Sequence, residues 1–256
     1  MRLNQGQILG ADGERMSKSR GNVQDPDELV SRYGADSVRL FLMFMGPWDQ
    51  GGPWSPTGID GVHRFLRRVW TVVLDPTRGE GSASSAGADA GAGSNPTELR
   101  RRAHRTLAKV TEDHADFRWN TMISALMELT TDMFPLRGTD AVATPEWDEA
   151  VRLMLMMLAP LAPHISEELW ARHAAARGEE WTSVHAQRWP EFAPELVAMD
   201  TIELPIQVNG KLRDVVTCPR ACPRSRSSRS SSHETRSAPS SRGTRSCASS
   251  TSPAAW

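Results

Sequence analysis

Apolar residues recur at helical spacing along most of the chain. The clearest case is the stretch 59–74, where side chains three or four positions apart are apolar: Val62, Phe65, Leu66, Val69, Trp70 and Val73. This spacing places them on one face of an α-helix, while the other face carries Arg64, Arg67 and Arg68. The pattern therefore predicts an amphipathic helix from Ile59 to Leu74.

Similar spacing, together with capping signals, predicts six further helices. Asp25 and Pro26 are typical of a helix start and Gly34 is a stop signal, so a helix is expected from Pro26 to Tyr33. The other five are expected over residues 35–45, 96–117, 119–134, 145–158 and 163–175. Short connections between amphipathic helices indicate a helical bundle, so the fold is expected to be mainly α.

Strand signals are confined to two places. Near the start, residues 4–9 and 15–18 flank the turn pair Asp12-Gly13, which predicts a small hairpin. Near the end, apolar and polar residues alternate over 202–215, interrupted by Asn209-Gly210, a strong hairpin turn signal. This second hairpin is expected to be incomplete as a domain, since two strands alone are only marginally stable in water.

Composition changes abruptly at three points. Residues 78–95 are dominated by Gly, Ala and Ser, which predicts a flexible loop. After Glu191, prolines replace the helical spacing. From Cys218 onward the chain contains seven arginines, one acidic residue and thirteen serines, without any Val, Ile, Leu, Met or Phe. This composition predicts a disordered Ser/Arg-rich tail over residues 218–256.

Charge and cysteine content exclude several classes of protein. The chain has 30 Lys and Arg against 31 Asp and Glu, and its three Cys all lie in the tail. A disulfide framework or thiolate metal site is therefore not expected in the rest, and the scattered His predict no metal site either. No apolar stretch approaches the roughly 18 residues of a membrane span, and the first residues lack a secretory signal. We expect a cytoplasmic protein with no membrane partner.

One short segment has the chemistry of a phosphate-binding loop. Residues 15–22, Arg-Met-Ser-Lys-Ser-Arg-Gly-Asn, combine three cations with two hydroxyls and end near a glycine. Cations, hydroxyls and loop N–H groups suit a polyphosphate ligand. Taken alone, such an octamer is more often a solvated surface loop, and it lacks the frame of a P-loop.

The context of this segment changes that interpretation. Arg15 to Ser19 closely resembles the Lys-Met-Ser-Lys-Ser signature of class I aminoacyl-tRNA synthetases, with Arg in place of the first Lys. Residues 21–40 resemble the junction that follows this signature in the branched-chain amino-acid members. Five further segments resemble the leucyl-tRNA synthetases specifically: residues 43–54, 61–70, 117–128, 158–170 and 204–213. The resemblance covers essentially residues 2–216, apart from the predicted loop.

The resemblance implies a function and a set of site residues. The family joins leucine to tRNA(Leu) through a leucyl-adenylate made from ATP. Mg²⁺ is expected to accompany the nucleotide. The resemblance also implies a monomeric enzyme. Lys18 would be catalytic, stabilising charge on the departing pyrophosphate, and ATP would be contacted by Arg15, Met16, Ser17, Lys18 and Ser19. The basic helix faces would contact tRNA, through Arg64, Arg67, Arg68, Arg100, Arg101, Arg102, Arg105 and Lys109.

Two departures from the family pattern limit this expectation. Nothing in the 256 residues resembles the family's His-Ile-Gly-His motif, so we expect a fragment that is inactive by itself. The tail after Thr217 abandons the family-like strand pattern, which favours a shift of reading frame there. The expected segments are the end of a catalytic domain (1–57), a tRNA-binding helical bundle (58–192), the start of a small C-terminal α/β domain (193–217) and the tail (218–256).

Two alternatives stay open at this point. The chain could belong to the valyl, isoleucyl or methionyl enzymes, although residues 47–54 and 158–170 disfavour them. It could instead be a stand-alone RNA-binding module that uses its basic faces and tail without catalysis. Without the resemblance, the arginines between Arg100 and Lys109 are more simply a solvated helix face.

Overall fold

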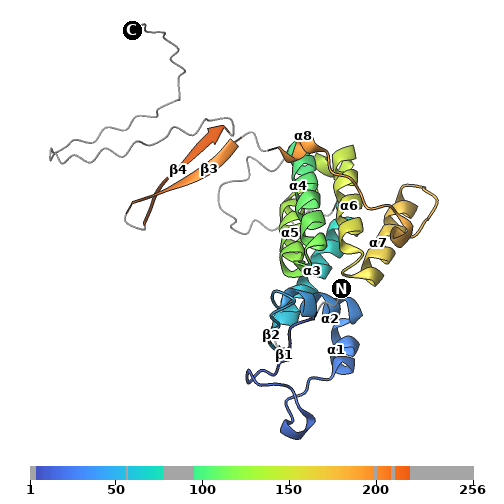
Figure 1. Ribbon diagram of the computed structural model, residues 1–256. Helices are drawn as coiled ribbons and strands as arrows, with labels where there is room; N and C mark the ends of the chain where they lie inside the picture. Colours follow the sequence, from blue (N-terminus) through green and yellow to red (C-terminus); the bar gives the residue numbers. More distant parts are fainter. Residues whose placement is uncertain (1–3, 56, 78–94, 199–200, 209–210, 220–256) are drawn as a thin grey trace, which may run out of the picture. The chain divides into compact units, whose positions relative to one another are not determined.

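The computed structural model describes residues 4–55, 57–77, 95–198, 201–208 and 211–219. The chain divides into two compact units, Met1–Asp200 and Thr201–Trp256. The predicted flexible loop, apart from Asn95, and residues 220–256 of the predicted tail lie outside the described residues. Cys218 and Pro219, the first two residues of that predicted tail, are the last two residues of a described strand. The shift of reading frame stays a prediction. In Figure 1 the helices of the first unit form a bundle, and strands β1 and β2 lie together near one end of it.

Residues 4–55 contain two short strands and two helices. The strands are β1 (Ile8–Leu9) and β2 (Gly52–Pro53), and the helices are α1 (Pro26–Tyr33) and α2 (Ala35–Phe44). The predicted hairpin is limited to one antiparallel bridge, Leu9 to Arg15, while β1 forms a parallel ladder with β2. Turn residues fix where the chain reverses, but the partner of a strand is fixed by the tertiary fold.

The helix predicted from Pro26 to Tyr33 is confirmed, and its caps explain its bounds. The side chain of Asp25 accepts a hydrogen bond from the N–H of Asp27, and Pro26 occupies the first turn. Gly34, at φ 84°, ends α1 and precedes α2 directly. A positive φ of this kind favours glycine, so the chain can turn sharply between two helices.

Five longer helices form the bundle: α3 (Gly58–Leu74), α4 (Pro96–Ala115), α5 (Trp119–Met133), α6 (Pro145–Leu158) and α7 (Pro163–Ala176). They confirm the predicted helical bundle. Helix α4 packs between α5 and α6, while α3 contacts α5 and α7 (Figure 1). The short helix α8 (Pro194–Val197) packs on α4.

Apolar faces predicted from spacing meet in one core. Val62, Leu107, Leu126, Met154 and Leu158 are all fully buried, although they come from four different helices. Burial of such side chains supplies the main driving force for the bundle, and truncation of one buried Leu to Ala typically costs about 2–5 kcal/mol.

Several predicted helix ends are wrong by one or two residues, and two of them show why. Helix α4 ends at Ala115, and Phe117 has a left-handed φ of 57°, so it belongs to the connection instead of the helix. The N–H of Arg118 donates to the carbonyl of Asp113, which closes this turn. Phe134 begins a 3₁₀ turn, Phe134–Leu136, after α5. Apolar spacing alone does not predict such turns, because Phe117 and Phe134 continue the spacing in the sequence although the backbone has left the helix; Phe134 still packs against the core, whereas Phe117 is exposed.

The second unit contains the predicted antiparallel hairpin. Strand β3 (Thr201–Val208) pairs with β4 (Lys211–Pro219), from Thr201 opposite Pro219 to Val208 opposite Lys211. The register shifts between Ile206 and Gln207. The predicted turn residues Asn209 and Gly210 lie outside the described residues. Across the parts of the chain that the structure covers, every helix is too short or too polar to cross a membrane.

Candidate functional site

The cationic loop, residues Arg15–Asn22, leaves the fold through a tight turn. The N–H of Gly10 donates to the carbonyl of Glu14 at 2.7 Å, and the N–H of Glu14 donates to Oδ1 of Asp12 at 3.0 Å. The hydrogen bond from the N–H of Glu14 holds the pKa of the Asp12 carboxyl below its usual range, and the hydrogen bond from the Asn22 side chain lowers it further. The turn therefore keeps an anionic side chain at the base of a loop rich in cations.

Asn22 ties the two ends of this loop together. Its Oδ1 accepts a hydrogen bond from the N–H of Ser17 at 2.8 Å, and its Nδ2 donates to Oδ2 of Asp12 at 3.1 Å. Nδ2 also lies 3.4 Å from the carbonyl oxygen of Arg15. A single amide thus links the loop to the turn before it, because Asn can donate and accept at once. The sequence places Asn22 at the end of the loop but does not predict this bridging role.

The middle of the loop is a short 3₁₀ turn, Lys18–Arg20, that presents polar groups to solvent. Ser17 Oγ and Ser19 Oγ are hydrogen-bonded at 2.8 Å, and Gly21, at φ 67°, closes the turn onto the carbonyl of Lys18. Met16 is partly buried and packs against the core, so it anchors the loop. Backbone and hydroxyl donors are thereby gathered beside Lys18.

The cations of the loop differ in their pairing. Arg20 forms an ion pair with Glu14 at 3.2 Å. Arg15 and Lys18 are exposed, and neither forms an ion pair with any residue that the structure describes. An unpaired ammonium next to hydroxyl and backbone donors suits a phosphate ligand, because no internal partner has to be displaced first.

The predicted tRNA-binding residues of α4 lie in a different electrostatic setting. We call Arg100, Arg101, Arg102, Arg105 and Lys109 the α4 basic face. Four of them form ion pairs within the bundle: Arg100 with Glu149 at 2.6 Å, Arg102 with Asp132 at 2.7 Å, Arg105 with Glu98 at 3.5 Å and Lys109 with Asp113 at 2.9 Å. Arg101 is half-buried on the same helix. Acids of α4 itself, α5 and α6 therefore neutralise much of this face.

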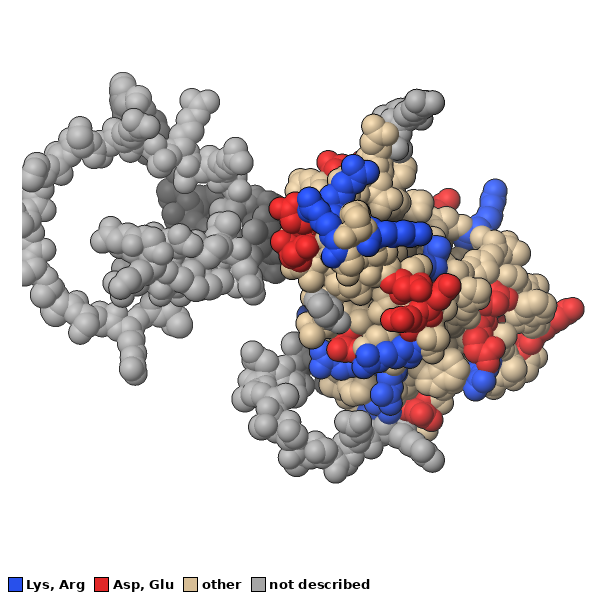
Figure 2. All heavy atoms as spheres, turned by 90° about the horizontal axis from the view of Figure 1, so that it is seen from below, with Lys and Arg blue, Asp and Glu red and all other residues tan. Residues whose placement is uncertain are grey.

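The arginines of α3 form fewer ion pairs with other described residues than the cations of α4 do. Arg64 and Arg67 are exposed and form no ion pair within the described part of the chain. Arg68 is half-buried, with its guanidinium 4.7 Å from the centre of the Phe134 ring and 3.5 Å from the Thr131 hydroxyl. Figure 2 shows blue and red side chains intermixed over the visible face, so this face is not a field of one sign.

Two carboxyl groups of the bundle have pKa values below the usual range. Burial acts to raise the pKa of Glu149, but hydrogen bonds from Arg100 and His104 outweigh burial and lower it from its ordinary 4.5. Burial also acts against ionisation of Asp113, and hydrogen bonds from Lys109 and other neighbours lower its pKa. Both groups thus favour the folded state in their ionised form.

This balance predicts a loss of stability in acid. A lowered folded pKa gives stability that is present above the unfolded value and is lost as pH falls through the folded value. We expect the free energy of urea unfolding to decrease as pH is lowered from 6 towards 3, and Asp113→Asn should make that decrease shallower. Glu128→Gln, at an exposed position of α5, is the matched control and should leave the pH slope unchanged. Equal slopes for all three proteins would contradict this account.

Comparison of the chain with known protein families identifies the family to which it belongs. Residues 97–226, about half of the chain, match the family described as the anticodon-binding domain of tRNA ligase. The chain belongs to this family. Residues 3–50, which include the cationic loop, match the class I tRNA synthetases of the I, L, M and V type. The two matches cover much of the stretch 2–216 over which the sequence resemblance was found.

Individual relatives of this chain are leucine–tRNA ligases. The enzyme of Rubrobacter xylanophilus is 51% identical over 217 residues, 85% of this chain and 24% of the relative. That of Herpetosiphon aurantiacus is 46% identical over 211 residues, 82% of this chain and 24% of the relative. The chain therefore spans about a quarter of the length of the curated relatives that it matches.

A solved structure supports the same relationship. The crystal structure of a ternary complex of Agrobacterium radiobacter LeuRS, tRNA and LeuAMS aligns with a TM-score of 0.66 at 32% identity. The alignment covers 87% of this chain and 28% of the solved chain. The predicted resemblance to the leucyl members of class I is confirmed.

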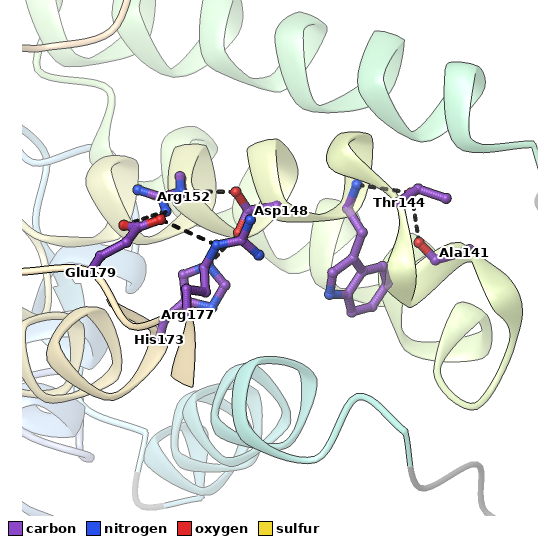
Figure 3. A network of polar contacts seen from close by, with 8 residues as sticks. Ala141, Thr144, Asp148, Arg152, His173, Arg177 and Glu179 are labelled. Atoms are coloured by element: carbon purple, nitrogen blue, oxygen red, sulfur yellow. Dashed lines mark hydrogen bonds and ion pairs between the residues drawn. The ribbon is translucent and has the colours of Figure 1, made fainter. Parts of the chain in front are cut away.

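The bundle also contains a charged network that the sequence analysis did not predict (Figure 3). Asp148 of α6 accepts hydrogen bonds from Arg152 at 3.0 Å and His173 at 2.7 Å, and pairs with Arg177 at 2.9 Å. Glu179 lies between Arg152 and Arg177 and pairs with both. Burial lowers the pKa of His173 although Asp148 acts to raise it. The i, i+4 spacing of Asp148 and Arg152 was the available signal. This network joins α6 to the end of α7.

Proposed function

We propose that this chain serves in a leucine–tRNA ligase, where the cationic loop contacts the phosphates of ATP and the bundle contacts tRNA(Leu). The observation that carries the proposal is the exposed Lys18, which forms no ion pair with any described residue, in a loop held in shape by Asn22. The resemblance to leucine–tRNA ligases over most of the chain supports it. The same proposal assigns residues 1–57 to the end of a catalytic domain, 58–192 to the tRNA-binding bundle and 193–217 to the start of a C-terminal domain.

Lys18 would act during formation of leucyl-adenylate. As the leucine carboxylate attacks the α-phosphate, negative charge grows on the departing pyrophosphate. The Lys18 ammonium, with Arg15 and the hydroxyls of Ser17 and Ser19 nearby, would stabilise that charge. Fixed donors that meet charge as it develops lower the barrier more than they strengthen ground-state binding.

Magnesium fits this scheme as a companion of ATP. Within the described residues, no group of three or more His, Cys, Asp or Glu side chains could hold a metal ion. Mg²⁺ would therefore be held mainly by the ATP phosphates and would neutralise part of their charge, as it commonly is in phosphoryl-transfer sites. We further propose a monomeric enzyme of the cytoplasm.

The bundle would hold tRNA through phosphate contacts, and pairing decides which cations contribute most. Arg100, Arg102, Arg105 and Lys109 must each give up an acidic partner before they meet a phosphate. Arg64 and Arg67 have no such partner among the described residues. We therefore place the stronger contact at α3. The α4 basic face becomes the second candidate.

Salt dependence tests this assignment. Each lost phosphate contact removes a slope of about one from the plot of log affinity against log salt concentration. Arg64→Gln with Arg67→Gln should lower the slope of tRNA(Leu) binding by about two, and Arg100→Gln with Arg102→Gln should lower it less. The two double variants remove the same charge and act as controls for one another. A larger change from the α4 pair would reverse the assignment.

A chimeric enzyme tests the proposed function as a whole. The segment of the Rubrobacter xylanophilus ligase that is homologous to this chain would be replaced by the residues of this chain. We expect the chimera to attach leucine to tRNA(Leu). A folded chimera that binds tRNA without any charging would contradict the proposal and favour the stand-alone RNA-binding module.

A further inference from the structure

Two charged side chains of α2 reach the connection between α6 and α7. Oδ2 of Asp36 accepts a hydrogen bond from the N–H of Ile165 at 2.7 Å. The guanidinium of Arg39 donates from Nε to the carbonyl of Leu161 at 3.4 Å and from its terminal nitrogen to the carbonyl of Pro160 at 3.3 Å. Asp36 and Arg39 are three residues apart, so they lie on one face of α2. Their partners are more than 120 residues away in the sequence.

The signs of the two charges match the helix ends that they meet. The start of α7 has free N–H groups and a positive dipole end, and it has no side-chain cap of its own, because Ala162 precedes Pro163 there. Asp36 supplies the missing acceptor from another helix. Arg39 meets the carbonyls of Pro160 and Leu161, which lie just beyond the negative end of α6. Exchange of the two charges would place each at the wrong end.

Asp36 is held at this point at some energetic cost. Only 7% of the residue is exposed, and its second oxygen, Oδ1, is buried without a hydrogen-bond partner among the described atoms. An unsatisfied buried oxygen is normally unfavourable. Its neighbours on α2, Val38, Leu40 and Phe41, are apolar and buried, so the core itself does not require a carboxylate here. The contact to α7 gives the carboxylate a reason to be there.

The contact joins two parts of the chain that have different roles in the proposed function. Helix α2 follows the cationic loop and α1 along the chain, whereas the α6–α7 connection belongs to the bundle. We propose that Asp36 and Arg39 are positioning residues, which fix the orientation of the bundle relative to the segment that carries Lys18. This inference rests on the proposed function: tRNA held by the bundle would then meet the adenylate in the correct register.

Two assays on the chimeric ligase separate a positioning role from a catalytic one. Leucine-dependent exchange of pyrophosphate into ATP reports adenylate formation, whereas aminoacylation also needs the bound tRNA. For Asp36→Asn and Arg39→Gln we expect exchange rates within about twofold of the parent, and kcat/KM for tRNA lower by about tenfold or more, since a displacement of about 1 Å can cost that much. Arg39→Lys should restore part of the loss. Equal losses in both assays, or no loss in either, would overturn the proposal.

Matched controls exclude a general effect of removing charge. Asp27→Asn and Arg188→Gln change the same residue types at positions where no ion pair appears among the described residues, and both should behave like the parent in both assays. If the parent chimera itself were inactive, the proposed function would fail on its own, before any variant was compared.

The contact can also be tested in the 256-residue chain without any activity. The amide of Ile165 should exchange with solvent at least about tenfold faster in Asp36→Ala than in the parent chain, while amides in the middle of α5 keep their rates. Asp36→Asn, which retains an acceptor, should show a smaller change and serves if the alanine variant does not fold. An unchanged rate at Ile165 in folded variants would show that Asp36 does not hold α7, and the proposal would then be wrong regardless of activity.

Discussion

Replacement of Lys18 by alanine in the chimeric ligase should slow adenylate formation by about 10²-fold or more, with little change in the KM for leucine. The reason is that Lys18 is exposed, forms no ion pair with described residues, and would meet charge that appears only as pyrophosphate departs. Loss of one preorganised donor to developing charge commonly costs about 10²–10³ in kcat. Single-turnover formation of leucyl-adenylate is the measurement that isolates this step.

Neighbouring substitutions show whether the effect belongs to Lys18 itself. Arg20→Gln removes a cation from the same loop, but that cation already pairs with Glu14, so the rate should change little. Lys18→Arg should recover only part of the rate, because a planar guanidinium does not reproduce a compact ammonium. A change confined to the KM for ATP, with an unaltered single-turnover rate, would assign Lys18 to ground-state binding instead.

The polypeptide of these 256 residues should show no leucine-dependent exchange of pyrophosphate above the background measured without leucine. It contains the loop proposed to contact the phosphates, but no sequence that resembles the His-Ile-Gly-His motif of the family. Without groups that hold adenosine and leucine, the reactants are not brought together, and the large advantage of proximity is lost. The assay is exchange of labelled pyrophosphate into ATP at saturating leucine.

The chimeric ligase is the positive control for this result, since it supplies the remainder of a related enzyme around the same residues. Circular dichroism of the 256-residue polypeptide should show a folded helical bundle, so that a negative result reflects missing chemistry and not unfolding. Leucine-dependent exchange by the polypeptide alone, abolished by Lys18→Ala, would mean that its own residues form a complete adenylation site.

Helix positions could be predicted because their signals are local. The Asp25 cap, Pro26 and Gly34 lie next to the helix that they bound, and the apolar spacing of residues 59–74 is contained within one helix. The same locality explains the errors at Phe117 and Phe134, which follow the apolar spacing although the backbone has already left the helix. The chemistry of the loop could also be predicted, since all its cations and hydroxyls lie within residues 15–20.

The sequence by itself thus determined the helices, the cationic loop and the family. Only the tertiary structure decided which groups face one another: β2 as the partner of β1, the acids that neutralise the α4 basic face, and the contact of Asp36 and Arg39 with the α6–α7 connection. The physical reason is the distance along the sequence over which each interaction acts. Capping and apolar periodicity act over one or two helical turns, whereas strand pairing and ion pairing join residues that come close only after the helices have packed around a common core.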